Sequence, residues 1–207
     1  KVSKKMERKN LSSFYEKKQI IGHGSYGNVF LIIDKNTQKK YAAKTLFQDE
    51  NKNKNQFLKE KDAYLKINSP AVLKLISYSL EDFEGKPNPT LIVEYMSKGS
   101  LEKYITWGKT SPTKSLTMTQ KYIILLGLAL GMKSLHSNWI IHRDLKPDNI
   151  LLDDNFYPRI GDLGSSFISK NLELSQIKMK TKKNIVTPLY MAPEILSDEP
   201  YTPKVDV

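Results

Sequence analysis

The chain has 207 residues, of which 39% are hydrophobic and 27% charged, and 33 Lys and Arg outnumber 22 Asp and Glu to give a net charge of +11. This composition is that of a folded globular protein and excludes an intrinsically disordered chain. The absence of cysteine excludes a disulfide framework and a thiolate metal site.

The positive charge raises the possibility of a nucleic acid or another anionic partner. The lysines, however, are spread through loops and tails among Asn, Gln and Glu, with no zinc-finger spacing and no basic-region heptad. A solvated surface is therefore the favoured interpretation, and an anionic partner is the alternative.

The sequence predicts no transmembrane segment, because its longest apolar run, residues 123–132, is far shorter than the ~20 residues that span a bilayer. The start of the chain does not resemble a secretory signal. With the lack of cysteine, this favours a cytoplasmic, reducing location. The oligomeric state stays open.

The first half of the chain has the pattern of an antiparallel sheet with one helix. Residues 1–13 are polar and basic and are expected to form a tail or linker. Short β-favouring runs follow at 19–21, 28–33 and 38–44, separated by glycines and then by a turn at 34–37. A helix is predicted at 56–67, ended by Ser69 and Pro70, and two further strands at 72–80 and 90–95.

The second half is mainly helical. Residues 116–137 form the clearest helix, and Thr117 followed by Gln120 fits a capping box at its start. Short strands and loops are expected at 140–152 and 159–160, followed by a long polar stretch at 162–194. The sequence thus predicts an α+β protein with a strand-rich lobe at 14–95 and a helical lobe at 96–207.

A G-x-G-x-x-G pattern stands at residues 22–27. Dinucleotide-binding folds share this pattern, but there it opens a helix, whereas here a strand is predicted to follow. A glycine loop between two antiparallel strands can lay its N–H groups over phosphates because no Cβ is in the way. An ordinary glycine-rich hairpin is the alternative.

Lys44 ends the third predicted strand, and Glu60 lies on the helix that follows. The carboxylate of Glu60 could hold the Lys44 ammonium against a pair of phosphates. Taken alone, an ordinary surface lysine is an equally good interpretation of this pattern.

Residues 142–149 read His-Arg-Asp-Leu-Lys-Pro-Asp-Asn. This segment resembles the catalytic loop of protein kinases, H-R-D-L-x-x-x-N. Asp-Leu-Gly at 162–164 is similar to the family's D-F-G, with Leu in place of Phe, and Ala-Pro-Glu at 192–194 matches its A-P-E. The resemblance runs from about Phe14 to Val207. It implies a two-lobed kinase fold with ATP bound between the lobes, and a C-terminal lobe that lacks its last helices.

The resemblance also implies roles for individual residues. Asp144 would accept the proton of the attacking hydroxyl, and Lys146 would neutralise charge on the transferred phosphoryl group. Thr187 would hydrogen-bond toward these two residues. Asn149 and Asp162 would bind Mg²⁺.

In the same way, Lys44 and Glu60 become a catalytic ion pair. Val93 corresponds to the gatekeeper, and Glu94 and Met96 belong to the hinge that binds adenine. The full set implied to contact ATP is Ile21, Gly22, Gly24, Gly27, Val29, Ala42, Lys44, Val93, Glu94, Met96 and Leu151.

The implied activity is transfer of the γ-phosphoryl group of Mg-ATP to serine or threonine of a protein substrate, with Lys146-Pro147 favouring these over tyrosine. Dual specificity stays open. The alternative of a pseudokinase or another non-catalytic kinase-like module would show the loss of Lys44, Asp144, Asn149 or Asp162, and all four are present. Because family members continue beyond the position of Val207, residues 1–207 alone are expected to turn over substrate hardly at all.

Overall fold

A computed structural model describes residues 6–24, 27–47, 52–111, 115–169, 188–197 and 199–207. The chain divides into two compact units, which are described separately. Unit 1 comprises Lys1–Leu65 and Leu73–Met96, and unit 2 comprises Lys66–Val72 and Ser97–Val207. The short segment 66–72 runs from the end of the predicted helix to the start of the next predicted strand, and it groups with unit 2 rather than with the first lobe.

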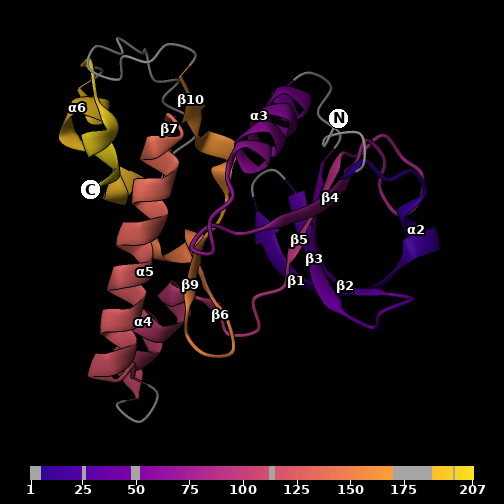
Figure 1. Ribbon diagram of the computed structural model, residues 1–207, viewed down its shortest axis with the longest axis horizontal. Helices are drawn as coiled ribbons and strands as arrows, with labels where there is room; N and C mark the ends of the chain where they lie inside the picture. Colours follow the sequence, from indigo (N-terminus) through magenta and orange to yellow (C-terminus); the bar gives the residue numbers. More distant parts are fainter. Residues whose placement is uncertain (1–5, 25–26, 48–51, 112–114, 170–187, 198) are drawn as a thin grey trace. The chain divides into compact units, whose positions relative to one another are not determined.

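Unit 1 is built on a five-stranded antiparallel sheet with the strand order β1-β2-β3-β5-β4 (Figure 1). The strands are β1 (Tyr15–Gly24), β2 (Gly27–Asp34), β3 (Lys40–Leu46), β4 (Leu75–Ser79) and β5 (Thr90–Glu94). All five were predicted from short β-favouring runs, and the expected meander of the first three is confirmed. β1 is longer than predicted, although most of its residues are exposed.

The turn between β2 and β3 is fixed by one side chain. Asp34 Oδ1 accepts hydrogen bonds from the backbone N–H groups of Asn36 (3.0 Å) and Thr37 (2.8 Å) and from the Thr37 hydroxyl (3.0 Å). These bonds stabilise the carboxylate and so lower the pKa of Asp34 from its ordinary value, and the Thr37 N–H is the largest cause. An Asp at this place therefore specifies the reversal that the sequence indicated.

The two faces of the sheet have different partners. On one face a core forms from Leu11, Tyr15, Ile32, Ala43 and Ile92. Helix α3 (Lys52–Lys66) lies on the other face. Ala43 points into the core just described, so the side chain of the next residue, Lys44, projects from the opposite face, and there it contacts Glu60 of α3. Figure 1 shows α3 and α2 (Leu11–Phe14) on opposite sides of the sheet. Helix α3 begins earlier than the predicted residue 56.

The segment expected to be a tail or linker contacts the sheet from Glu7 onward. Glu7 forms a parallel bridge with Tyr78 on the edge strand β4, and the Arg8 N–H donates to Tyr78 O at 2.7 Å. Arg8 also lies over the Phe14 ring, 4.5 Å from its centroid. Leu11 is fully buried. These contacts join residues 7–14 to unit 1, with Leu11 in its core and Phe14 packed against it.

Unit 2 is organised around the long helix α5 (Met118–Ser137), which confirms the predicted helix and its capping box. Thr117 Oγ1 accepts from Gln120 N at 3.2 Å, and Gln120 Oε1 accepts from Thr117 N at 2.9 Å. Two glycines of α5 face β9 (Pro158–Ile160) at close range. An added Cβ would stand 2.3 Å from Pro158 Cγ at Gly127 and 2.6 Å from Ile160 Cδ1 at Gly131.

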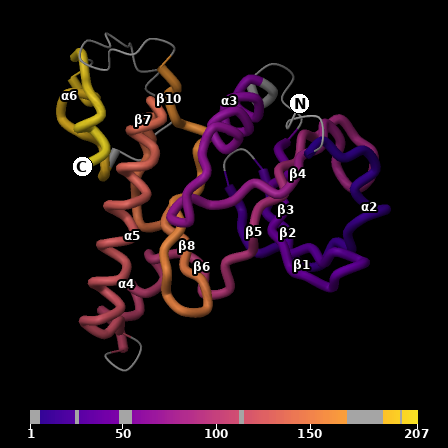
Figure 2. The backbone as a smooth tube through the Cα atoms, viewed as in Figure 1, coloured from indigo at the N-terminus to yellow at the C-terminus, as the bar shows by residue number. Residues whose placement is uncertain are grey.

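Short elements complete unit 2, and Figure 2 lets the reader follow the chain through them. One small sheet has the order β6-β8-β9, and a second pairs β10 with β7. The remaining elements are β6 (Gly99–Ser100), α4 (Leu101–Thr110), β7 (Ile140–Ile141), η2 (Pro147–Asn149), β8 (Ile150–Leu152), η3 (Leu163–Ser165), β10 (Phe167–Ile168), η5 (Pro188–Tyr190), α6 (Pro193–Leu196) and η6 (Pro203–Asp206).

The described helices and strands confirm the predicted α+β class, with an antiparallel sheet in the first part of the chain and helices in the second. Within the part of the chain that the structure describes, no helix is both long and apolar enough to cross a bilayer.

Burial of Leu11 can be tested by truncating its side chain. We expect Leu11→Ala to lower the free energy of unfolding by about 2–5 kcal/mol, because it leaves a cavity against the core of unit 1. The matched control is Leu80→Ala, since Leu80 is 49% exposed, and its cost should stay within about 0.5 kcal/mol. Urea denaturation measures both, and equal losses would show that α2 does not pack on the sheet.

Candidate functional site

Four of the predicted site residues of unit 1, Val29, Ala42, Lys44 and Val93, share one face of its sheet. The strand register places Val29 opposite Lys44, and Ala42 opposite Val93. Because side chains two apart on a strand share a face, these four side chains project from the same side. This is the face opposite the core that contains Leu11 and Ile32.

The glycine pattern forms the hairpin between β1 and β2, and the predicted strand after it is confirmed. Gly22 pairs with Val29, and Gly24 pairs with Gly27. Gly27 is required sterically, because a Cβ there would stand 2.1 Å from Thr45 O. Ile21 is 42% exposed, so its side chain is accessible on this hairpin.

Lys44 and Glu60 form the ion pair that the sequence indicated. Lys44 Nζ lies 2.9 Å from both Glu60 oxygens, and the Glu60 residue is 1% exposed. A carboxylate this buried is stable only when a cation or hydrogen-bond donors replace its hydration, and here the cation is Lys44. The pair fixes the lysine ammonium on the same sheet face as Val29.

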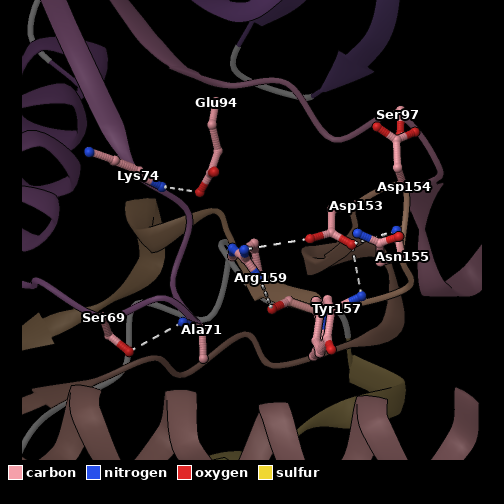
Figure 3. Close-up of polar contacts among 11 residues, drawn as sticks. Ser69, Ala71, Lys74, Glu94, Ser97, Asp153, Asp154, Asn155, Tyr157 and Arg159 are labelled. Atoms are coloured by element: carbon pink, nitrogen blue, oxygen red, sulfur yellow. Dashed lines mark hydrogen bonds and ion pairs between the residues drawn. The ribbon is translucent and has the colours of Figure 1, made fainter.

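The end of β5 is joined to the segment before β4. Glu94 N donates to Lys74 O at 3.1 Å, and Lys74 N donates to Glu94 Oε1 at 2.8 Å, the contact drawn in Figure 3. Val93 and Met96 are each 7% exposed. Two of the three predicted gatekeeper and hinge residues, Val93 and Met96, are thus buried, and the third, Glu94, is half-buried and hydrogen-bonded to Lys74.

Three predicted residues of unit 2 lie within hydrogen-bonding distance of one another in the catalytic-loop motif. Lys146 Nζ is 2.9 Å from Asp144 Oδ2. Asn149 Nδ2 donates to Asp144 O at 2.7 Å and to Asp144 Oδ2 at 3.1 Å. Asp144 is 6% exposed. One carboxylate is therefore held by a lysine on one side and an amide on the other.

His142 connects this loop to the segment that carries Asp162. Its Nδ1 accepts the Asp144 N–H at 3.2 Å, so Nε2 carries the ring proton and donates to Gly161 O at 3.0 Å. Gly161 N in turn donates to Asn149 O at 2.8 Å. Asp162, the next residue, is thereby fixed relative to Asp144 and Asn149.

Asp162 has a left-handed backbone, with φ 53° and ψ 66°. A non-glycine residue in this region is strained and is retained where the surroundings impose it. Leu163, which stands where the family motif has Phe, is fully buried. The substitution therefore keeps an apolar anchor next to Asp162.

A second buried carboxylate, that of Asp206, supports the loop from its other side. Asp206 Oδ1 accepts the Arg143 N–H at 2.7 Å, and Oδ2 accepts the His142 N–H at 2.8 Å. His136 Nε2 lies 2.9 Å from the same Oδ2. These bonds hold Arg143 at a positive φ of 66°. The Arg143 side chain donates to Ser165 O at 2.8 Å and to the Tyr201 hydroxyl at 3.2 Å.

His136 is the residue that sequence reasoning missed. No role for His136 can be predicted from the sequence, because its partner Asp206 lies 70 residues further along the chain. No local spacing signal could have connected the two. Its ring lies against the carboxylate that positions the loop, so it belongs to the support of the candidate site.

The oxygen ligands present suit Mg²⁺ in part. The Asn149 amide uses its nitrogen as the donor to Asp144, which leaves Oδ1 to serve as a ligand. Asp162 offers a carboxylate directly after Gly161, whose N–H donates to Asn149 O. Among the described residues no group of three or more His, Asp or Glu side chains could hold a metal alone. Mg²⁺ is commonly held by one or two protein oxygens together with phosphates and water, and this pair fits that mode.

Two predicted site residues of the second half of the chain remain, Leu151 and Thr187. Leu151 lies in β8, half-buried and paired with Ser100 and Arg159. Thr187 lies outside the described residues.

Comparison with known proteins decides the family. The family model for the protein kinase domain matches residues 15–207. The chain belongs to the protein kinase family. The kinase domain is 35% identical over 204 residues to Rhodopsin kinase grk7-b of Xenopus laevis, covering 95% of the chain and 34% of that protein.

Other relatives come from distant organisms. Identity is 30% over 201 residues to the L-type lectin-domain containing receptor kinase V.5 of Arabidopsis thaliana, covering 96% of the chain and 29% of the relative. Identity is 31% over 195 residues to the Dual specificity protein kinase shkB of Dictyostelium discoideum, covering 93% of the chain and 28% of the relative. The chain thus spans about a third of the length of the curated relatives it matches.

The support of the loop by Asp206 can be tested by removing its charge. Asp206→Asn should lower the free energy of unfolding by about 2–5 kcal/mol, because an amide cannot accept all three hydrogen bonds and leaves buried donors unpaired. Asp148→Asn, an exposed carboxylate in the same loop, should cost within about 0.5 kcal/mol. Chemical denaturation followed by circular dichroism measures both variants, and an Asp206 variant as stable as the control would remove the assigned role.

Proposed function

We propose that this kinase domain transfers the γ-phosphoryl group of ATP to serine or threonine hydroxyls of a protein substrate, with Mg²⁺ as the metal ion. The observation that carries the proposal is the cluster of Asp144, Lys146 and Asn149, tied through Gly161 to Asp162. A carboxylate beside a cation and two oxygen ligands is what phosphoryl transfer needs for positioning and charge stabilisation.

Asp144 would orient the attacking hydroxyl and accept its proton. Its two oxygens are engaged by Lys146 and Asn149, which fixes the carboxylate before a substrate arrives. A preorganised base of this kind contributes through geometry as well as basicity. Lys146, at 2.9 Å from Asp144, would also stabilise negative charge that develops on the transferred group.

The sheet face of unit 1 would bind the nucleotide. Lys44, held by Glu60, offers a fixed ammonium to phosphates. Val29, Ala42 and Val93 provide apolar contacts for a purine on the same face. The hairpin of Gly22, Gly24 and Gly27 brings backbone N–H groups close without a Cβ to obstruct them.

The choice of serine or threonine rests on two supports. One is the Lys146-Pro147 sequence in the loop. The other is the likeness to kinases such as Rhodopsin kinase grk7-b. The likeness to a protein named as a dual specificity kinase makes tyrosine the hydroxyl to include as a comparison in every assay.

The proposed base is tested by Asp144→Asn. We expect kcat to fall by about 10²-fold or more, because the amide cannot accept the hydroxyl proton, while ATP affinity changes little. Phosphate transfer from labelled ATP to serine, threonine and tyrosine peptides measures the first effect, and equilibrium nucleotide binding measures the second.

Asp148→Asn is the control, since Asp148 is exposed in the same loop. It should keep wild-type turnover. An Asp144 variant that retains more than about a tenth of wild-type kcat would contradict the assignment. Transfer to tyrosine alone would overturn the serine/threonine proposal.

The proposed metal ligand is tested by Asp162→Ala. Loss of this carboxylate should weaken binding of ATP in the presence of Mg²⁺ by about tenfold or more, since one charged ligand is removed from the cation. Binding of ATP in the presence of a chelator should be nearly unchanged. Calorimetric titrations with and without Mg²⁺ give the two values, and equal losses in both would argue against metal ligation.

A further inference from the structure

A hollow of about 340 Å³ lies in unit 2, at the junction of α4 with the start of α5. Its walls come from three separate segments and combine three aromatic rings and a leucine with polar side chains. The lining residues are Tyr104, Trp107, Ser115, Leu116, Thr117, Gln120 and Phe156. None of these residues belongs to the proposed phosphoryl-transfer site.

The aromatic rings meet edge to face. Tyr104 lies 5.5 Å from Trp107 and 5.5 Å from Phe156, with interplanar angles of 75° and 71°. Burial raises the pKa of the Tyr104 phenol from its ordinary value, which agrees with an apolar surrounding. Three packed rings thus form the apolar part of the hollow, beside the polar side chains of Ser115, Thr117 and Gln120.

The walls are held from behind by the core of unit 2. Tyr104, Leu116 and Phe156 pack against a buried cluster of Ile124, Ile150 and Leu152. Three of the lining side chains are thus fixed by packing within unit 2, which lowers the ordering cost of binding a ligand.

The turn that carries Phe156 is itself fixed by hydrogen bonds (Figure 3). Asp153 Oδ1 accepts from the N–H groups of Asn155 and Tyr157, each at 2.9 Å, and its Oδ2 lies 3.6 Å from Arg159. Ser97 Oγ donates to Asp154 Oδ1 at 2.5 Å. Both acidic side chains of this turn thus have partners within it or next to it.

Lysines lie over the rings at the edge of the hollow. Lys103 Nζ is 4.4 Å from the centroid of the Trp107 ring, and Lys98 Nζ is 5.5 Å from that of Phe156. Lys109 near the end of α4 and Lys121 in the first turn of α5 are exposed. Against these four lysines, Glu102 is the one acidic residue among the described residues from 98 to 121.

We propose that this hollow is a docking site for an acidic segment of a partner protein that inserts one large apolar side chain. The aromatic walls provide the contact area that anchors such a side chain. The surrounding lysines would pair with carboxylates on either side of it and speed the encounter.

Single-stranded nucleic acid fits the same geometry less well. Nucleobases bind by stacking on open aromatic faces. Here the rings stand edge to face, and lysine ammonium groups already cover the faces of Trp107 and Phe156. The docking site does not depend on the proposed catalytic activity, and binding can be measured without any phosphoryl transfer.

The test uses fluorescently labelled 12-residue peptides and the 207-residue chain. One peptide has aspartates and glutamates around a central leucine, a second has serine in place of the leucine, and a third has lysines in place of the acidic residues. By fluorescence anisotropy, the first should bind about tenfold or more tightly than the second, and the third should not bind. Quenching of Trp107 should accompany binding and persist in Trp139→Phe, which removes the second tryptophan.

Paired charge reversals locate the site. The double variant Lys98→Glu, Lys103→Glu should weaken binding of the acidic peptide about three- to tenfold. The control is Lys133→Glu with Lys204→Glu, which changes the net charge equally at exposed positions elsewhere in unit 2. It should leave the affinity for the peptide nearly unchanged. Equal losses in the two double variants would overturn the proposal, as would equal binding of the leucine and serine peptides. An oligonucleotide that binds as tightly as the peptide, and is weakened by the first pair alone, would replace the proposed partner with nucleic acid.

Discussion

The carboxylate of Asp206 is the constraint on which the catalytic-loop motif depends. It accepts both consecutive backbone N–H groups at His142 and Arg143 and is itself only 4% exposed. A charge removed from water to this extent is stable only when hydrogen bonds replace its hydration. The same bonds hold Arg143 in its left-handed backbone conformation, and the residue that follows is Asp144. The position of the candidate base is thus set by a residue more than sixty positions away.

The two units solve the problem of burying charge in different ways. In unit 1, Glu60 is stabilised by a cation, Lys44, and this pairing places an ammonium where a phosphate could approach. In unit 2, Asp206 is stabilised mainly by backbone N–H donors. Its carboxylate therefore holds the conformation of the loop and is not directed toward a ligand. The first arrangement prepares for binding, and the second fixes a loop.

Features that depend on neighbours in sequence could be predicted from the sequence. The capping pair of Thr117 and Gln120 and the glycine hairpin both need residues only a few positions apart, and the loop motif at 142–149 is contiguous. Contacts between distant segments could not be predicted. Residues 7–13 look like part of a polar tail because Leu11 is isolated among polar and charged residues, and only the sheet shows where it packs. His136 shows no pattern of its own, and the grouping of residues 66–72 with unit 2 depends on the bond from Ile160 N to Ala71 O.

Position 131 of α5 accepts little more than glycine, although it does not belong to the proposed nucleotide-binding site. The glycine lets α5 approach so closely that Ile160 and Ala71 O occupy the space of a Cβ. A larger residue at position 131 must shift the Ile160 side chain or displace β9, which ends two residues before the proposed metal ligand Asp162. Variation at this helix position is therefore restricted by packing against β9 and not by contact with a ligand. A tolerated larger residue at Gly131 would be accompanied by a smaller one at Ile160.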